Sequence, residues 1–299
     1  MKRGIILALS AYIFWGFFPV YFKQLQNVEA LEIAANRIIW TFAFLFVINL
    51  FGKNWKQLIC NVIKGKNKFY MFFPALLIGT NWFVYVWAIN AGFIIETSLG
   101  YFISPLFSVF FGVFFLKESL RKVQWFAVSI AAIGVLYMTI IYGNFPWIAL
   151  YLAVTWSLYG LLRKKSPLSS IEGLTVESGL LSIPVLVYLL IHMINGTGSL
   201  FAVDLRTDLF LLGCGLVTAL PLLVFVKAAR LIDLSLIGIL QYIYPTLLLL
   251  VGVFIYDEIL TEAKIVGFVF IWTALFIYTT EGTIFLRKKR MRLGTQTTS

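Results

Sequence analysis

The chain has 299 residues, of which 61% are hydrophobic and only 12% are charged, and its formal net charge is +11. Soluble domains have about 45 to 50% apolar and about 25% charged residues, so this composition and a mean hydropathy of +0.93 exclude a water-soluble fold. The sequence therefore predicts an integral membrane protein, and spans of about 20 residues joined by short turns give about ten helices.

We expect ten transmembrane helices with no extramembrane domain between them. The end after Arg290, with its Thr, Gln and Ser residues, is typical of a disordered tail. Two cysteines, Cys60 and Cys214, are too few and too far apart for a disulfide framework or a metal site. The predicted spans, in chain order, are Ile5 to Phe22, Ile33 to Phe51, Phe69 to Asn90, Thr97 to Leu116, Val123 to Ile141, Phe145 to Leu162, Leu174 to Ile194, Leu209 to Val226, Leu234 to Tyr256 and Ile265 to Leu286.

Lysine and arginine residues collect in alternate linkers, which predicts that both chain ends are cytoplasmic. With this orientation, the basic residues on the outer side number four of the 24, namely Lys23, Arg37, Arg206 and Lys264. The net positive charge is thus a topology signal, and we expect no nucleic-acid partner. The first apolar run follows Lys2 and Arg3 but lacks a small-x-small cleavage site, so we interpret it as a retained helix and not as a signal peptide.

A sequence repeat divides the chain into two halves. Residues 98–120 recur without a gap as residues 238–260, an offset of 140 that relates Pro105 to Pro245. Five spans in each half, an odd number, place the halves upside down relative to each other. We predict an all-α integral membrane protein with two inverted five-helix repeats, residues 1–143 and 144–290, and a disordered cytoplasmic tail, 291–299. The two matching prolines predict paired helix kinks near mid-membrane.

The densest polar and aromatic stretch of the chain is residues 79–90. Its asparagine needs hydrogen-bond partners inside a bilayer, either as a link between helices or as part of a cavity wall that orients a substrate. Aromatic rings beside it could stack on a flat or cationic solute. We expect the substrate-binding candidates to line one central cavity between the halves, and they are Asn81, Trp82, Tyr85, Tyr101, Gln241 and Tyr242.

Few charged residues lie within the spans, where they are costly. Arg37 and Glu177 are related by the same offset of 140, so we expect them at equivalent places on opposite sides of the membrane, not in contact. One could gate outward access and the other inward access, or both could extend to an interface. If transport is coupled to protons, Glu177 is the first candidate carrier and Glu96 the second, with a paired, structural carboxylate as the alternative for Glu177.

Motifs for catalysis or for ATP-driven pumping are absent. The chain has no GxxxxGK[ST], HExxH or GxSxG pattern and a single histidine, His192. We expect no enzyme activity, no cofactor and no metal, so transport must be driven by a gradient or by exchange.

Several motifs, spread over essentially the whole chain, resemble the RarD family of the drug/metabolite transporter superfamily, also called EamA-type transporters. They lie in Tyr12 to Lys23, Glu32 to Arg37, Asn81 to Asn90, Glu96 to Pro105 and Leu240 to Pro245. The chain departs from the family pattern at Ser104, where an asparagine is common. The resemblance implies a ten-helix bundle of two inverted repeats in the bacterial inner membrane. The family is linked to chloramphenicol sensitivity, and related exporters move amino acids.

The leading hypothesis is a secondary exporter of small metabolites or drugs that works by alternating access. A passive channel or facilitator and a non-transporting membrane scaffold are the alternatives. The sequence leaves the substrate, the coupling ion, the net direction and the oligomeric state open.

Overall fold

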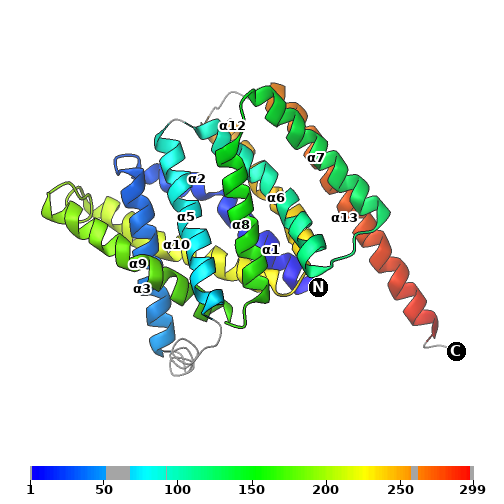
Figure 1. Cartoon of the computed structure of the whole chain (residues 1–299), viewed down its shortest axis with the longest axis horizontal. Coiled ribbons are helices and arrows are strands. Elements are labelled where there is room, and N and C mark those ends of the chain that lie inside the picture. Colours follow the sequence, from blue (N-terminus) through cyan, green and yellow to red (C-terminus); the bar gives the residue numbers. More distant parts are fainter. Residues whose placement is uncertain (1, 52–67, 92, 257–261, 297–299) are drawn as a thin grey trace.

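The computed structural model describes residues 2–51, 68–91, 93–256 and 262–296, and within these ranges the regular elements are all helices (Figure 1). Cys60 and residues 257–260 of the sequence repeat lie outside the described part. The elements are α1 (Lys2–Gly16), α2 (Phe18–Phe22), the short 3₁₀ helix η1 (Lys23–Leu25), α3 (Ala30–Phe51), α5 (Phe69–Asn90), α6 (Ile94–Leu116), α7 (Lys122–Tyr142), α8 (Trp147–Lys165), α9 (Ser170–Ile194), α10 (Leu205–Ala229), α11 (Leu234–Gln241), α12 (Ile243–Tyr256) and α13 (Glu262–Gln296).

The predicted all-helical membrane fold is confirmed. Nine helical segments in the described ranges are long and apolar enough to cross a membrane, with Lys2–Leu25 and Leu234–Tyr256 each counted as one segment. α8 lies beside α5 and α6 within the bundle (Figure 1) and corresponds to the sixth predicted span, Phe145 to Leu162, so that the described helices account for all ten predicted spans. Its last turn carries three basic residues, Arg163, Lys164 and Lys165, which lower its hydropathy relative to the other nine.

Several helix contacts come in pairs that the offset of 140 relates. α8 packs on α5 and α6. At an offset of 140, α8 corresponds to α1, α5 to α10, and α6 to α11 and α12, and α1 packs on α10, α11 and α12. The packing of α3 on α10 likewise corresponds to that of α5 on α9, and α7 lies along α13 (Figure 1). We call the end of the bundle with the N-terminus the inner end, because it is the predicted cytoplasmic end, and the opposite end the outer end. The division of the chain near residue 143 stays a prediction.

Glycines allow close approach where the two halves meet. A Cβ atom on Gly215 of α10 would lie 2.2 Å from the backbone of Trp40 in α3. A Cβ atom on Gly238 of α11 would lie 2.6 Å from the carbonyl oxygen of Pro105 in α6. Such small residues let membrane helices pack backbone to backbone, where no hydrophobic effect drives association.

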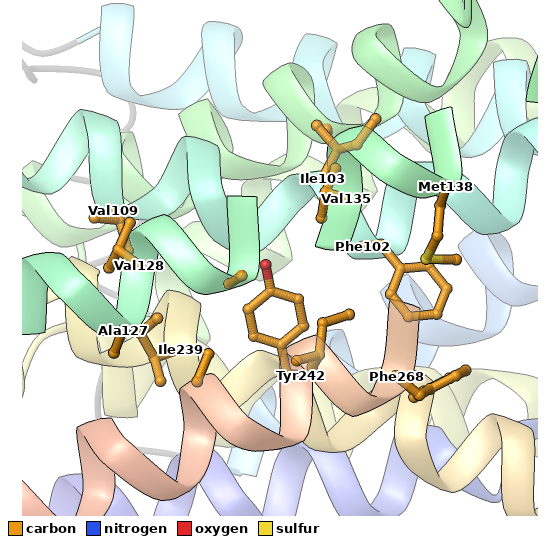
Figure 2. Packing of buried hydrophobic residues seen from close by; sticks show 14 of the residues in the cluster. Phe102, Ile103, Val109, Ala127, Val128, Val135, Met138, Ile239, Tyr242 and Phe268 are labelled. Carbon is orange, nitrogen blue, oxygen red and sulfur yellow. The ribbon is translucent and has the colours of Figure 1, made fainter. Parts of the chain in front are cut away.

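A core of buried apolar side chains holds α6 and α7 against α11, α12 and α13. Phe102 of α6 lies 5.0 Å from Phe268 of α13, measured between ring centroids. Figure 2 shows these rings with Tyr242, whose side chain is enclosed by the same cluster. This packed region lies on one side of the bundle, so space for a ligand has to be sought elsewhere.

The two repeated helices differ in shape. α6 continues through Pro105 without a break. Its counterpart is divided at Tyr242 into α11 and α12, so the interruption lies three residues before Pro245. α6 packs closely on α11 near the inner end, whereas α12 packs mainly on α1. The structure is therefore closed between the repeated helices at the inner end and less closely packed at the outer end.

Candidate functional site

Arg37 on α3 lies in the outer half of the bundle and contacts residues of α2, α5 and α10. Its Nε donates a hydrogen bond to Thr218 Oγ1 on α10, 3.1 Å away. The centre of its guanidinium group lies 5.2 Å from the ring centroids of Trp82 and Phe22 and 5.9 Å from that of Phe18. Among the described residues, no carboxylate lies within ion-pair distance of this guanidinium.

Three tyrosines from three helices form a cluster within electrostatic reach of Arg37. The ring of Tyr101 on α6 lies 6.0 Å from that of Tyr85 on α5 and 4.9 Å, edge to face, from that of Tyr244 on α12. All three hydroxyls interact electrostatically with the guanidinium.

The side chains of this group are only partly covered. Arg37, Trp82, Tyr85, Tyr101 and Tyr244 are each of intermediate exposure, and they come from α3, α5, α6 and α12. Side chains that are partly exposed remain accessible to a small molecule. We call Arg37, Trp82, Tyr85, Tyr101 and Tyr244 the arginine–tyrosine site.

Asn81 is one turn before Tyr85 on α5, but its amide is already occupied. Its Nδ2 donates to the carbonyl oxygen of Leu152, 3.0 Å away, and to Thr155 Oγ1, 2.8 Å away, both on α8. Only 9% of Asn81 is exposed. This geometry favours the link between helices over the cavity wall, the two alternatives left open by the sequence.

Gln241 and Tyr242 are not brought to Tyr85 and Tyr101. Gln241 is buried and donates from Nε2 to Ser104 Oγ, 3.0 Å away, in a small polar group between α6 and α11. Tyr242 is fully buried within the apolar cluster of Figure 2. The six candidates therefore do not all lie together. Trp82, Tyr85 and Tyr101 belong to the arginine–tyrosine site, whereas Asn81, Gln241 and Tyr242 have other partners.

Glu177 lies near the inner end of α9 and is paired. Its Oε1 is 3.3 Å from Nη1 of Arg163 on α8, and its Oε2 accepts a hydrogen bond from the Tyr159 hydroxyl, 3.1 Å away. Arg163 also donates to the carbonyl oxygens of Ser169 and Ser170. Both charged side chains are almost completely buried. Glu177 and Arg37 thus have separate partners, in line with their expected places in opposite halves of the bundle.

The side chain of Glu96, the second coupling candidate, lies outside the described residues. The sequence interpretation also missed three residues that the structure brings into these networks, namely Tyr244, Thr218 and Arg163. A signal for Arg163 was present, because an arginine in the last turn of a span and an acid early in the next approach each other when the turn is short. Tyr244 is next to the interruption that Pro245 predicts, but nothing in the sequence showed that its ring would meet Tyr101.

Comparisons with known proteins agree with this architecture. The sequence model of the EamA-like transporter family matches residues 2–140. An uncharacterized transporter of Vibrio cholerae is 42% identical over 94% of this chain and 93% of its own length. Protein RarD of Escherichia coli (strain K12) is 39% identical over 93% of this chain and 94% of its own length.

A solved crystal structure is similar in fold alone, with a TM-score of 0.68 at 17% identity, covering 93% of this chain and 98% of the other. The relatives at 42% and 39% identity, which match nearly the whole length of the chain, establish the family. The chain is a multi-pass membrane protein that belongs to the RarD family of EamA-type transporters.

Proposed function

We propose that this protein is a secondary transporter that moves a small molecule across the bacterial inner membrane by alternating access, with export as the net direction. The observation that carries the proposal is the unequal packing of α6. This helix is closely packed on α11 near the inner end, while towards the outer end it meets α12 mainly through the Tyr101–Tyr244 ring contact. The arginine–tyrosine site lies on the less closely packed side, as a substrate site reached from outside would.

Polar contacts between the halves support closure at the inner end. Glu118, which follows α6, accepts hydrogen bonds from the backbone N–H groups of Leu234 and Ser235 at 2.7 and 2.8 Å and from the Ser235 hydroxyl at 2.7 Å. It thereby caps the N-terminus of α11, where a carboxylate is favoured by the unpaired N–H groups and the helix dipole. Lys164 of α8 lies 3.6 Å from the same carboxylate.

Alternating access then amounts to an exchange between two symmetry-related crossings. In the described conformation the α6–α11 crossing is closed. In the opposite conformation the α6–α12 crossing closes over the arginine–tyrosine site and the α6–α11 crossing opens, releasing substrate at the inner end or admitting it there. Inverted repeats allow the two conformations to be built from equivalent helix packings, with the two halves exchanging their arrangements.

Proton coupling through Glu177 remains part of the proposal. A carrier must be able to lose its partner, and here the carboxylate is held by Arg163 and Tyr159 between α8 and α9. Coupling therefore needs a conformation in which these two helices separate. Glu177→Gln should then keep exchange of substrate but lose acceleration by an imposed pH gradient, whereas full acceleration would exclude Glu177 as the carrier.

The test uses purified protein in two steps. A thermal-shift screen against amino acids, aromatic compounds, amines and antibiotics identifies a ligand, since a ligand at 100 times its Kd stabilises by about 2.7 kcal/mol. The labelled ligand is then measured in proteoliposomes with and without unlabelled ligand inside. A carrier shows faster uptake when the far side is loaded, because the loaded carrier returns with substrate.

Flux that does not saturate and is not accelerated by internal ligand would instead show a channel. No flux and no ligand, with other proteins co-purifying, would show a scaffold. Arg37→Gln should abolish uptake, and Arg206→Gln provides the matched control, because Arg206 is an exposed arginine at the outer end that hydrogen-bonds Gln24.

A further inference from the structure

The arginine–tyrosine site has an excess of hydrogen-bond donors. A guanidinium group has five N–H groups in a fixed plane. The one hydrogen bond found for Arg37 among the described residues uses Nε, which leaves the four N–H groups of the two terminal nitrogens. Aromatic rings lie against Arg37 through its cation–π contacts, so its hydrogen-bonding edge is the part left for a ligand.

The tyrosines add hydrogen-bond donors to the site without adding negative charge. Tyr85, Tyr101 and Tyr244 bring three phenol groups together, and a phenol O–H can donate one hydrogen bond. The site therefore combines one positive charge with N–H and O–H donors, and no described side chain in it has a negative charge.

An arginine within a membrane span is costly unless a counter-charge approaches it. The equivalent position in the other half, Glu177, shows how this cost is removed there, by an ion pair with Arg163. Arg37 lacks such a partner among the described residues. The negative charge that would balance its guanidinium group is therefore not found in the described part of the chain.

We propose that the arginine–tyrosine site binds a small organic anion, with its carboxylate or phosphate on the guanidinium edge of Arg37 and its flat or apolar part against the aromatic rings. This inference rests on the proposed transport function and specifies its substrate class. The sequence left a cationic solute open, on account of the aromatic lining. A cation would have to lie beside Arg37 in a medium of low dielectric constant, where repulsion between like charges is strong.

The experiment measures equilibrium binding, not transport, so its failure is distinguishable from failure of the transport proposal. Four probes share one benzene ring and differ in charge: benzoate, phenyl phosphate, benzyl alcohol and benzylamine. Each is titrated into purified wild-type protein at constant chloride concentration, up to about 10 mM, which detects binding as weak as a Kd of ~1 mM. We expect saturable stabilisation by at least one of the two anions and weaker effects of the neutral and cationic probes.

Variants locate the binding. Because hydrogen bonds to charged groups contribute about 1.5 to 3 kcal/mol, Arg37→Gln should raise the Kd of the anion about 10- to 100-fold. Arg37→Lys should restore part of the affinity, since it keeps the charge but loses the planar fork. Arg206→Gln is the control and should leave the Kd unchanged.

The comparison among probes in the wild-type protein needs no variant, so it holds even if Arg37→Gln fails to fold. Tyr101→Phe is a milder second variant that removes the hydroxyl of the central tyrosine, and it should also raise the Kd of the anion. Benzoate binding without phenyl phosphate binding would assign a carboxylate, and the reverse a phosphate. Tighter binding of benzylamine, no binding of either anion, or an anion Kd that Arg37→Gln does not change would each overturn the proposal.

Discussion

The buried pair between Arg163 and Glu177 gives a quantitative test of the inner half of the bundle. Replacing Arg163 with Met removes the guanidinium but keeps much of the side-chain volume. Glu177 is then left with a single described partner, the Tyr159 hydroxyl at 3.1 Å. The side chains of the pair are 0% and 2% exposed, so water cannot replace the lost charge.

Breaking a buried ion pair by removing one partner costs about 3 to 5 kcal/mol, because an uncompensated charge stays buried. We expect a loss in this range for Arg163→Met. Glu177→Gln should cost less, since Arg163 keeps the carbonyl oxygens of Ser169 and Ser170 as acceptors. The double variant removes both charges and should recover at least ~2 kcal/mol relative to the sum of the single losses.

The assay is reversible unfolding in mixed micelles, with all four proteins of the cycle measured under the same conditions. Gly173 on α9 offers an independent perturbation of the same pair, because its added Cβ atom would collide with the Arg163 guanidinium. Gly173→Ala should therefore destabilise the protein as well. Additive losses in the cycle, or a loss below ~0.5 kcal/mol for Arg163→Met, would refute the view that this pair stabilises the α8–α9 contact.

Three further predictions address packing, topology and the polar helix contacts. Gly215→Ala should destabilise the bundle by about 1 to 3 kcal/mol because of overpacking, whereas Gly282→Ala, which has open space around it, should not. In a background without native cysteines, probes at Gly143→Cys and Pro167→Cys, which are exposed and separated by α8, should label from opposite sides of the membrane; labelling from one side would contradict the topology. Asn81→Leu should lower the free energy of unfolding by about 1 kcal/mol and leave the Kd of a ligand unchanged, because Asn81 links α5 to α8. Loss of binding without loss of stability would instead show that Asn81 contacts the ligand.

The sequence was sufficient for the helices because membrane spans are set by composition. An apolar run of about 20 residues has few alternatives in a bilayer, where each backbone group must be hydrogen-bonded within its own segment. The predicted span Phe69 to Asn90 coincides with α5, and Leu234 to Tyr256 covers α11 and α12. The sequence predicts paired kinks at Pro105 and Pro245. α6 continues through Pro105, whereas the helix interruption at Tyr242 lies three residues before Pro245, and proline removes a helical hydrogen bond.

The candidate site was harder to predict because it depends on which faces of different helices meet. Tyr85 and Tyr101 were both expected to line the cavity, and their rings lie 6.0 Å apart, while their contact with a substrate stays a prediction. Asn81 is one turn from Tyr85, yet its side chain faces α8 and is hydrogen-bonded there. Tyr242 and Tyr244 are two residues apart, and the difference in direction places one in the apolar core and the other beside Tyr101. Sequence spacing fixes the relative angle of two side chains on a helix but not the helix that each one faces.

The differences in charge between equivalent positions bear on how the transport cycle would work. The offset of 140 relates Lys23 to Arg163 and Arg37 to Glu177. At the inner end the two residues neutralise each other, whereas at the outer end both are cations, and Lys23 Nζ lies 4.0 Å from the ring centroid of Tyr256. An anion at the proposed site therefore meets surplus positive charge towards the outer end and a neutral network towards the inner end.

Such an asymmetry affects affinity at each face of the membrane, but it cannot set the direction of net flux. In a reversible cycle, differences in binding free energy at the two faces are balanced by the free-energy difference between the two empty conformations. Only the gradients of substrate and of any coupled ion decide which way net transport runs. The unequal charges can therefore change which step of the cycle is slow without changing the direction of net transport.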